Sequence, residues 1–240
     1  MPKPSHSKPD TLTHVIKGAG NPSAPGYERD FAKFCNTYRE LLYYFVRKCG
    51  YNEADAKDHT QDFLARISQP EHNPLSQHNK ERGRFRNFIK WQMRSFLSAA
   101  KEKASAKKRG GDIKSISFDL QDAEQRFQVA DRKNLDPSEF FDRILALEIF
   151  RKVEAELAFQ YQQRGETALH ADLKPHLYGD TPEEIYADLA ARLSMTKRQI
   201  QAAIEKMRGS FRTTLRQHVS RLCANPADVE SELEALKRAL

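Results

Sequence analysis

The chain has 240 residues, enough for one large domain or two small ones that each bury a core. Its formal net charge of +7 and pI of about 9.2 are compatible with a polyanionic partner, although charge alone does not establish one. No apolar run approaches the roughly 20 residues that span a bilayer, and the polar start of the chain lacks the pattern of a secretory signal. We therefore expect a cytoplasmic protein without membrane insertion.

Charge is strongly segregated along the chain. Residues 76–115 carry twelve Lys and Arg against three Asp and Glu, a net +9, and residues 192–221 carry eight against one, a net +7. The intervening residues 116–191 carry eight against sixteen, a net −8. Two basic blocks separated by an acidic stretch indicate two contact surfaces for one polyanion.

Helical periodicity runs through almost all of the chain from Phe31 onward, and the alternating pattern of strands does not occur. We predict an all-α protein with two small helical domains joined by an extended linker, the C-terminal domain containing a helix-turn-helix. The predicted segments are a flexible arm at 1–26, a first domain at 27–103, a linker at 104–135, a second domain at 136–222 and an acidic tail at 223–240.

Three short patterns predict where helices begin. Asp136-Pro137-Ser138-Glu139 and Thr181-Pro182-Glu183-Glu184 each place a capping residue before a proline at the first helical position. Thr196, with Gln199 three residues later, has the spacing of a capping box.

The first predicted helix with an informative polar face covers residues 53–67. Its apolar side is formed by Ala56, Thr60, Phe63, Leu64 and Ile67. Asp55, Asp58 and Asp62 fall within about 60° of one another on the opposite side, with Gln61 beside them. This face is either solvated or a docking surface for a basic partner protein. His59 points away and no further ligand cluster is evident, so we expect no metal or cofactor.

Residues 84–97, RFRNFIKWQMRSFL, interleave cations with large apolar side chains. At 100° per residue, one apolar stripe contains Phe85, Phe88, Ile89, Met93, Phe96 and Leu97. Trp91 lies about 150° from the centre of that stripe, on a basic face. It either packs on a neighbouring segment or provides a stacking platform for unpaired bases. The candidate DNA contacts on and after this helix are Arg84, Asn87, Lys90, Trp91, Arg94, Ser95 and Lys101.

The second basic block predicts a helix-turn-helix. Residues 183–193 form a short helix, Ser194-Met195 turns the chain, and a longer helix follows the Thr196 cap. An amphipathic bundle helix with basic solvent contacts would give a similar pattern. The candidates for base edges are Lys197, Arg198, Gln201 and Glu205, and those for phosphates are Lys206, Arg208 and Arg212.

Several stretches together resemble sigma factors of bacterial RNA polymerase of the extracytoplasmic-function type, and most closely the group often found in planctomycete-like genomes. They are CGYNEADAKDHTQDFLARI, GRFRNFIKWQMRSFL with the following KKRGG, and DLAARLSMTKRQIQAAIEKMRGSFRTTLRQHV, in the order of the family. The resemblance covers about 190 residues, roughly 31–222. The chain departs from the family at Ser95, where Asn is common, and at Ser194, where Gly is usual.

The resemblance implies the role of each part. The helix with Asp58, Gln61 and Phe63 would bind the clamp helices of core RNA polymerase, and Asp55 and Asp62 flank that surface. The helix from Arg84 to Leu97 would recognise and melt the promoter −10 element, and the second domain would read the −35 element.

The implied function is transcription initiation at promoter DNA, with no catalytic site and with regulation by an anti-sigma factor or an extension of the chain. A helix-turn-helix regulator that acts without polymerase is the alternative. An enzyme acting on nucleic acid is not expected, because the sequence contains no nucleophile elbow or phosphate-cradling glycine loop. The role of residues 160–180 stays open.

Overall fold

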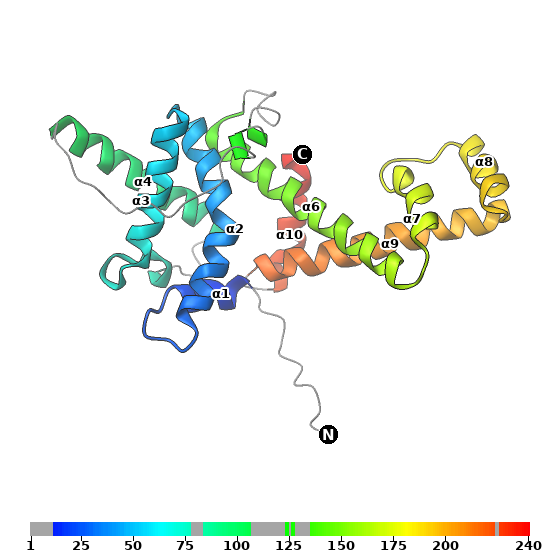
Figure 1. Ribbon diagram of the computed structural model, residues 1–240, viewed down its shortest axis with the longest axis horizontal. Coiled ribbons are helices and arrows are strands. Elements are labelled where there is room, and N and C mark those ends of the chain that lie inside the picture. Colours follow the sequence, from blue (N-terminus) through cyan, green and yellow to red (C-terminus); the bar gives the residue numbers. More distant parts are fainter. Residues whose placement is uncertain (1–11, 78–83, 107–122, 125, 128–134, 224–225) are drawn as a thin grey trace, which may run out of the picture. The chain divides into compact units, whose positions relative to one another are not determined.

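The computed structural model of the chain describes residues 12–77, 84–106, 123–124, 126–127, 135–223 and 226–240. Within these residues every regular element is a helix and no strand occurs, which confirms the predicted all-α class (Figure 1). The chain forms two compact units, Met1–Ala146 with Ser220–Leu240, and Leu147–Val219. These boundaries fall inside two long helices and differ from the domain limits that we predicted at residues 103 and 136.

The first unit is built around α2, an aromatic-rich helix. Its buried rings include Phe34 and Tyr38, whose centroids lie 6.3 and 5.4 Å from that of Phe85 on α4. Edge-to-face ring packing of this kind adds to the apolar burial that holds the helices together. The elements of this unit are α1 (Leu12–Ala19), α2 (Tyr27–Lys48), α3 (Glu53–Ser68), the 3-10 turns η1 (Pro70–His72) and η2 (Pro74–Gln77), α4 (Phe85–Ala106), the first part of α6 (Pro137–Gln163), η6 (Pro226–Asp228) and α10 (Val229–Ala239).

Helix α1 lies in the segment that we expected to be a flexible arm. Val15 and Ile16 are buried, so the prediction was wrong for Leu12–Ala19, while residues 1–11 lie outside the described part. Leu12, Val15, Ile16 and Ala19 have the spacing of one helical face, a signal that the surrounding prolines obscured. A Cβ at Gly18 would come within 2.1 Å of Oδ2 of the buried Asp30, so α1 approaches α2 where position 18 has no side chain.

Two described residues of the predicted linker pack on the first unit. Glu124 accepts hydrogen bonds from the Tyr43 hydroxyl at 2.6 Å and from Arg47 at 2.6 and 3.1 Å. Phe127 is buried, and its ring lies 5.4 Å from that of Phe140. Most of the predicted linker, residues 107–122, 125 and 128–134, lies outside the described residues.

The second unit contains the rest of α6, α7 (Thr167–Leu173), η5 (Lys174–His176), α8 (Glu183–Leu193) and most of α9 (Lys197–Leu222). Phe150 of α6 and Tyr178 both contact Phe211 of α9, with ring centroids 5.6 and 5.4 Å apart. The Tyr178 hydroxyl donates to Glu154 at 2.6 Å. Burial and this hydrogen bond both raise the pKa of Tyr178 above its usual range, so its hydroxyl remains a donor.

The helix starts agree with two of the three predicted caps. Asp136 Oδ1 accepts from the backbone of Ser138 and Glu139 at 2.7 and 3.0 Å, and Thr196 exchanges hydrogen bonds with Gln199 as a capping box does. The bonds from Glu139 and Ser138 lower the pKa of Asp136. Thr181 does not cap α8, because the helix begins at Glu183 after Pro182 and no side chain caps it.

Candidate nucleic-acid interface

The exposed face of α4 carries the only tryptophan of the chain. Trp91 is 62% exposed, whereas Phe85, Ile89 and Met93 on the opposite side are buried. The helical angles therefore predicted the exposure of Trp91 and most of the buried side correctly, while Phe88 and Phe96 of the predicted stripe are half-buried. The predicted contacts that share the exposed face with Trp91 are Asn87, Arg94, Ser95 and Lys101.

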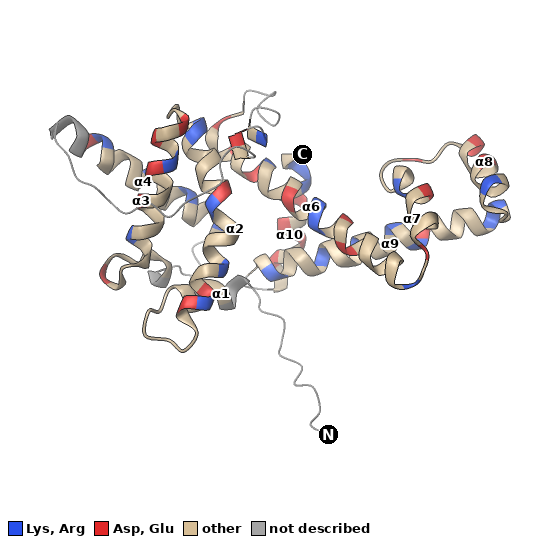
Figure 2. Cartoon of the chain, in the orientation of Figure 1, with Lys and Arg blue, Asp and Glu red and all other residues tan. Residues whose placement is uncertain are grey.

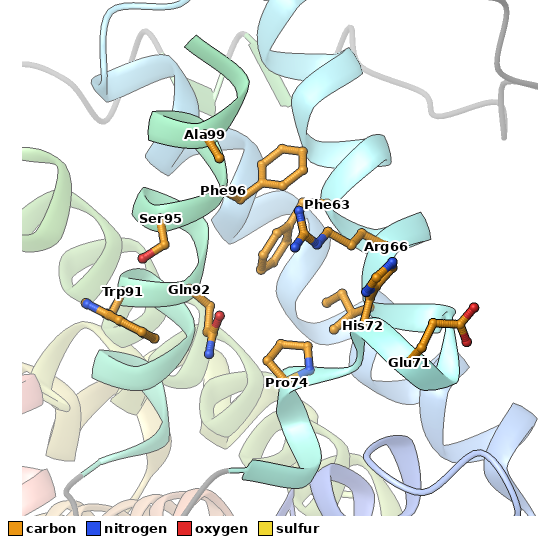
Figure 3. A pocket seen from close by; sticks show the side chains of 11 residues that line it. Phe63, Arg66, Glu71, His72, Pro74, Trp91, Gln92, Ser95, Phe96 and Ala99 are labelled. Atoms are coloured by element: carbon orange, nitrogen blue, oxygen red, sulfur yellow. The ribbon is translucent and has the colours of Figure 1, made fainter. Parts of the chain in front are cut away.

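A pocket of about 340 Å³ opens beside Trp91. Its side chains come from α4 on one side and from α3, η1 and Pro74 on the other (Figure 3). The lining residues that can donate or accept hydrogen bonds are Arg66, Glu71, His72, Trp91, Gln92 and Ser95. The apolar part of the lining comes from Phe63, Ile67, Pro74, Phe96 and Ala99. The pocket therefore combines ring surface with polar groups, one arginine and one carboxylate, and its rings and polar groups suit planar bases.

Two of the predicted DNA contacts at the start of α4 are held by carboxylates of the chain itself. Lys90 is buried, and its Nζ lies 2.8 Å from both Asp142 Oδ1 and Ser138 Oγ. Arg84, whose side chain is 35% exposed, lies 2.7 Å from Glu232. We expected both side chains on an open basic face, and the structure instead places Lys90 inside the first unit and Arg84 at its edge.

The sequence held a signal for this network that we did not use. Arg86 falls at about 100° on the same helical wheel, between Met93 and Leu97 of the apolar stripe. A cation at that position must be buried, and a buried cation requires a carboxylate partner. Arg86 indeed lies 3.3 Å from Glu232 and 3.7 Å from Asp142.

The carboxylates of α3 lie on the side opposite its buried residues, as predicted. Asp55 and Asp58 are exposed, and Gln61 and Asp62 are partly buried. Burial raises the pKa of Asp62, and Asp58 adds to that shift while His59 opposes it. Phe63, which the resemblance placed among the polymerase contacts, is buried with its ring 5.5 Å from that of Phe96. It belongs to the core between α3 and α4 and lines the pocket there, and it is not part of the acidic face. Within the described residues, no three His, Cys, Asp or Glu side chains gather as metal ligands would.

Helices α8 and α9 are joined by a turn in which Ser194 adopts φ 52° and ψ 40°. It is the only residue other than glycine with a positive φ in the described part of the chain. A residue with a side chain costs about 1 kcal/mol in this left-handed region, where the family that the sequence resembles usually has Gly. The turn places the Thr196 capping box at the start of α9, where Lys197, Arg198 and Gln201 are exposed.

Along α9, Lys and Arg recur over the whole helix (Figure 2). Glu205, Lys206 and Arg212 are exposed as predicted. Arg208 is different, because its guanidinium donates to the carbonyls of His176 and Gly179 and to the Thr181 hydroxyl at 2.6 to 3.1 Å. Arg208 therefore fixes the loop that leads into α8, which we had not predicted. Lys197 pairs with Glu183 of α8.

None of the protein-family models, curated proteins or solved structures compared with this chain matches it. Among the described residues, no helix combines the length and the apolar character needed to cross a membrane.

Proposed function

We propose that the chain is a sigma factor that binds core RNA polymerase and directs promoter recognition, DNA melting and transcription initiation. The observation that carries this proposal is the exposed Trp91 beside an aromatic and polar pocket on a basic helix. An exposed indole can stack on an unpaired base, and stacking of this kind contributes roughly 1–3 kcal/mol per base. The cations around it suit the phosphate backbone of a separated strand.

The other two surfaces have complementary roles in this proposal. The exposed carboxylates of α3, Asp55 and Asp58, suit a basic surface of core polymerase. The exposed first turns of α9, with Lys197, Arg198 and Gln201, suit base edges in the major groove of the upstream promoter element. A first helical domain would thus bind polymerase and the −10 element, and a second domain with a helix-turn-helix would bind the −35 element.

Reconstituted transcription tests the proposal. The purified chain and the core polymerase of its source organism are mixed with a library of genomic promoter fragments, and transcripts are sequenced. We expect transcripts with defined start sites that require the chain. If the chain neither binds core polymerase in a pull-down nor yields such transcripts, the proposal is overturned.

A DNA-binding regulator that acts without polymerase is the second candidate, because the exposed start of α9 is also what such a regulator needs. Sequence-specific retardation of duplex DNA by the chain alone, with no effect of added core polymerase, would favour it. The acidic face of α3 then has no role, so Asp58→Lys would leave DNA binding and regulation unchanged.

A further inference from the structure

Glu232 of α10 contacts two arginines at the start of the α4 face. Its Oε2 lies 2.7 Å from Arg84 Nε, and its Oε1 lies 3.3 Å from Arg86 Nε. Arg84 also donates to the carbonyl and the hydroxyl of Ser231, at 3.1 and 3.2 Å. Among the described residues, α10 therefore supplies every partner of the Arg84 side chain.

The burial pattern of α10 shows how this contact is held. Val229, Leu233 and Leu236 are buried, and they share one helical face with Glu232, whose side chain is only 7% exposed. An acid within an apolar stripe is costly unless a cation meets it. Docking of α10 therefore brings the Glu232 carboxylate to two arginines, Arg84 and Arg86.

We propose that α10 is an internal competitor for nucleic acid, in which Glu232 occupies Arg84 until a phosphate group of a bound strand displaces it. This inference rests on the proposed function only in taking the exposed face of α4 as the surface that meets DNA. Arg84 precedes Trp91 by seven residues, and two helical turns place both on the same side of α4. A strand stacked on Trp91 therefore runs along the side of the helix on which Arg84 lies.

Arg84 and Arg86 differ in whether a DNA phosphate can reach their side chains. Arg86 is 6% exposed at its side chain and lies between Glu232 and Asp142, so it remains inside the unit. Arg84 is 35% exposed, so solvent and a phosphate group can reach it. The competition therefore concerns Arg84, and Arg86 serves to hold the carboxylate in place.

The burial of the Glu232 carboxylate makes its contact with Arg84 replaceable by a phosphate group. Burial raises the pKa of this carboxyl, against the opposite pull of Arg86 and Arg84, so the ionised form is held at a cost. A phosphate on a solvated strand meets the same guanidinium without that burial. The incoming strand thus gains a charge-assisted contact, and the departing carboxylate regains its hydration.

Charge reversal on α10 tests the inference with a matched control. Glu232→Lys repels Arg84 and Arg86, whereas Glu234→Lys makes the same charge change two residues away, where Glu234 is exposed and pairs with Lys237. A fluorescein-labelled single-stranded DNA oligonucleotide of mixed sequence is the probe, and fluorescence anisotropy is recorded from 50 to 200 mM NaCl. We expect Glu232→Lys to bind about fivefold more tightly than Glu234→Lys near 0.1 M salt, with a salt slope steeper by about 0.7, the value of one added phosphate contact.

Two further variants exclude simpler explanations. Deletion of residues 226–240 removes α10 without adding a lysine and is expected to tighten binding in the same direction. Arg84→Ala in the Glu232→Lys background is expected to abolish the gain, because Arg84 is the group that is released. Equal affinities and slopes for Glu232→Lys and Glu234→Lys, or a gain that persists without Arg84, would overturn the inference, as would a failure of every variant to bind the oligonucleotide.

Hydrogen exchange gives a readout that does not depend on affinity. The amides of Val229–Ala239 are expected to exchange faster in the unmodified chain when the oligonucleotide is added. Unchanged protection at saturating DNA would contradict displacement of α10. Since neither measurement needs polymerase, a gain in Glu232→Lys without promoter-dependent transcripts would sink the proposed function alone, and normal transcripts with no gain would sink this inference alone.

Discussion

Lys90 and Asp142 form a largely buried ion pair that joins α4 to the start of α6, with Nζ of the lysine 2.8 Å from Oδ1 of the carboxylate. Burial lowers the pKa of Lys90, while the hydrogen bond and the charge of Asp142 raise it. Without the carboxylate, the Ser138 hydroxyl at 2.8 Å would be the remaining hydrogen-bond partner of the lysine among the described residues. The pair is therefore a part of the fold of the first unit.

Asp142→Ala is expected to lower the free energy of unfolding by about 2 kcal/mol. Removal of one member of a fully buried pair costs roughly 3–5 kcal/mol, and the loss is smaller here because Asp142 retains 23% exposure. Urea denaturation followed by far-ultraviolet circular dichroism measures the change. Glu148→Ala, which breaks an exposed pair with Arg151, is the control and should cost no more than about 0.5 kcal/mol. Equal losses for the two variants would contradict the structural role of the Lys90–Asp142 pair.

Docking of α10 is expected to weaken as pH rises above the usual glutamate value of 4.5. Glu232 binds its proton more tightly in the folded chain, because burial outweighs the pull of Arg86 and Arg84. The resulting stabilisation is present below pH 4.5 and is lost as pH rises through the raised pKa. The other charged groups that influence this carboxyl are Asp142, which raises its pKa, and Lys90, which lowers it.

Amide exchange of Val229–Ala239, corrected for the intrinsic pH dependence of exchange, measures this effect. Protection should fall as pH rises above 4.5 in the unmodified chain, and the fall should be smaller in Glu232→Gln, which cannot titrate at that position. Protection that rises with pH in the unmodified chain would show that the arginines outweigh burial.

Trp91→Ala is expected to impair promoter opening more than formation of the closed complex. Loss of one stacked base costs roughly 1–3 kcal/mol, which corresponds to about 5- to 150-fold in affinity for single-stranded DNA. Since Trp91 is 62% exposed, the stability of the fold should change by less than about 0.5 kcal/mol.

The single tryptophan also provides its own probe, because quenching of Trp91 fluorescence by single-stranded DNA reports stacking directly. Phe159→Ala removes an aromatic ring of similar exposure, 58%, from α6 and is the control. Equal losses in duplex and single-stranded binding would argue against a stacking role.

Arginines on α9 are expected to fall into two groups when replaced by alanine. Arg198→Ala, like Gln201→Ala, should alter the base preference at the upstream promoter element while leaving the fold intact, because both side chains are exposed. Arg208→Ala should instead lower stability by about 1–3 kcal/mol, since it leaves the His176 and Gly179 carbonyls without this donor.

Sequencing of the DNA fragments bound with polymerase separates these effects, with thermal unfolding as the parallel measurement. Arg212→Ala, at an exposed position suited to phosphate, is the comparison and should weaken binding to all sequences alike. An unchanged base preference in Arg198→Ala would show that α9 does not read the upstream element.

Asp58→Lys is expected to weaken binding to core polymerase by reversing a charge on the exposed face of α3, without a loss of helix content. Asp188→Lys makes the same charge change at an exposed position of α8 and should leave polymerase affinity nearly unchanged. Binding of labelled chain to immobilised core polymerase gives both values. Retention of full affinity by Asp58→Lys would remove the docking role of this face.

Periodicity and capping patterns predicted much of the fold. The bounds expected for the acidic helix and for residues 183–193 match α3 and α8 to within one residue, and all five side chains predicted on the apolar side of α3 are buried. Local rules succeed there because each helix carries its own apolar stripe, and α3 also has a side-chain cap from Asn52. The helical angle of Trp91 likewise sufficed to predict its exposure.

The tertiary contacts of the basic side chains could not be predicted, because their partners are distant in sequence. The pairing of Arg84 with Glu232 spans 148 positions, and no local pattern announces such a contact. The same holds for Arg208, whose acceptors are backbone carbonyls of a loop about 30 residues away. From side-chain type alone we predicted Arg84 and Arg208 on an open basic surface. In the structure both are held by tertiary contacts.

The close approach at Gly18 has a consequence for which sequences the first unit can tolerate. A Cβ there would lie 2.1 Å from the Asp30 carboxylate and 2.8 Å from its Cβ, so even the smallest side chain would force the buried aspartate aside. At this point α1 and α2 can lie close together because position 18 has no side chain. A larger residue at position 18 therefore demands a smaller one at position 30.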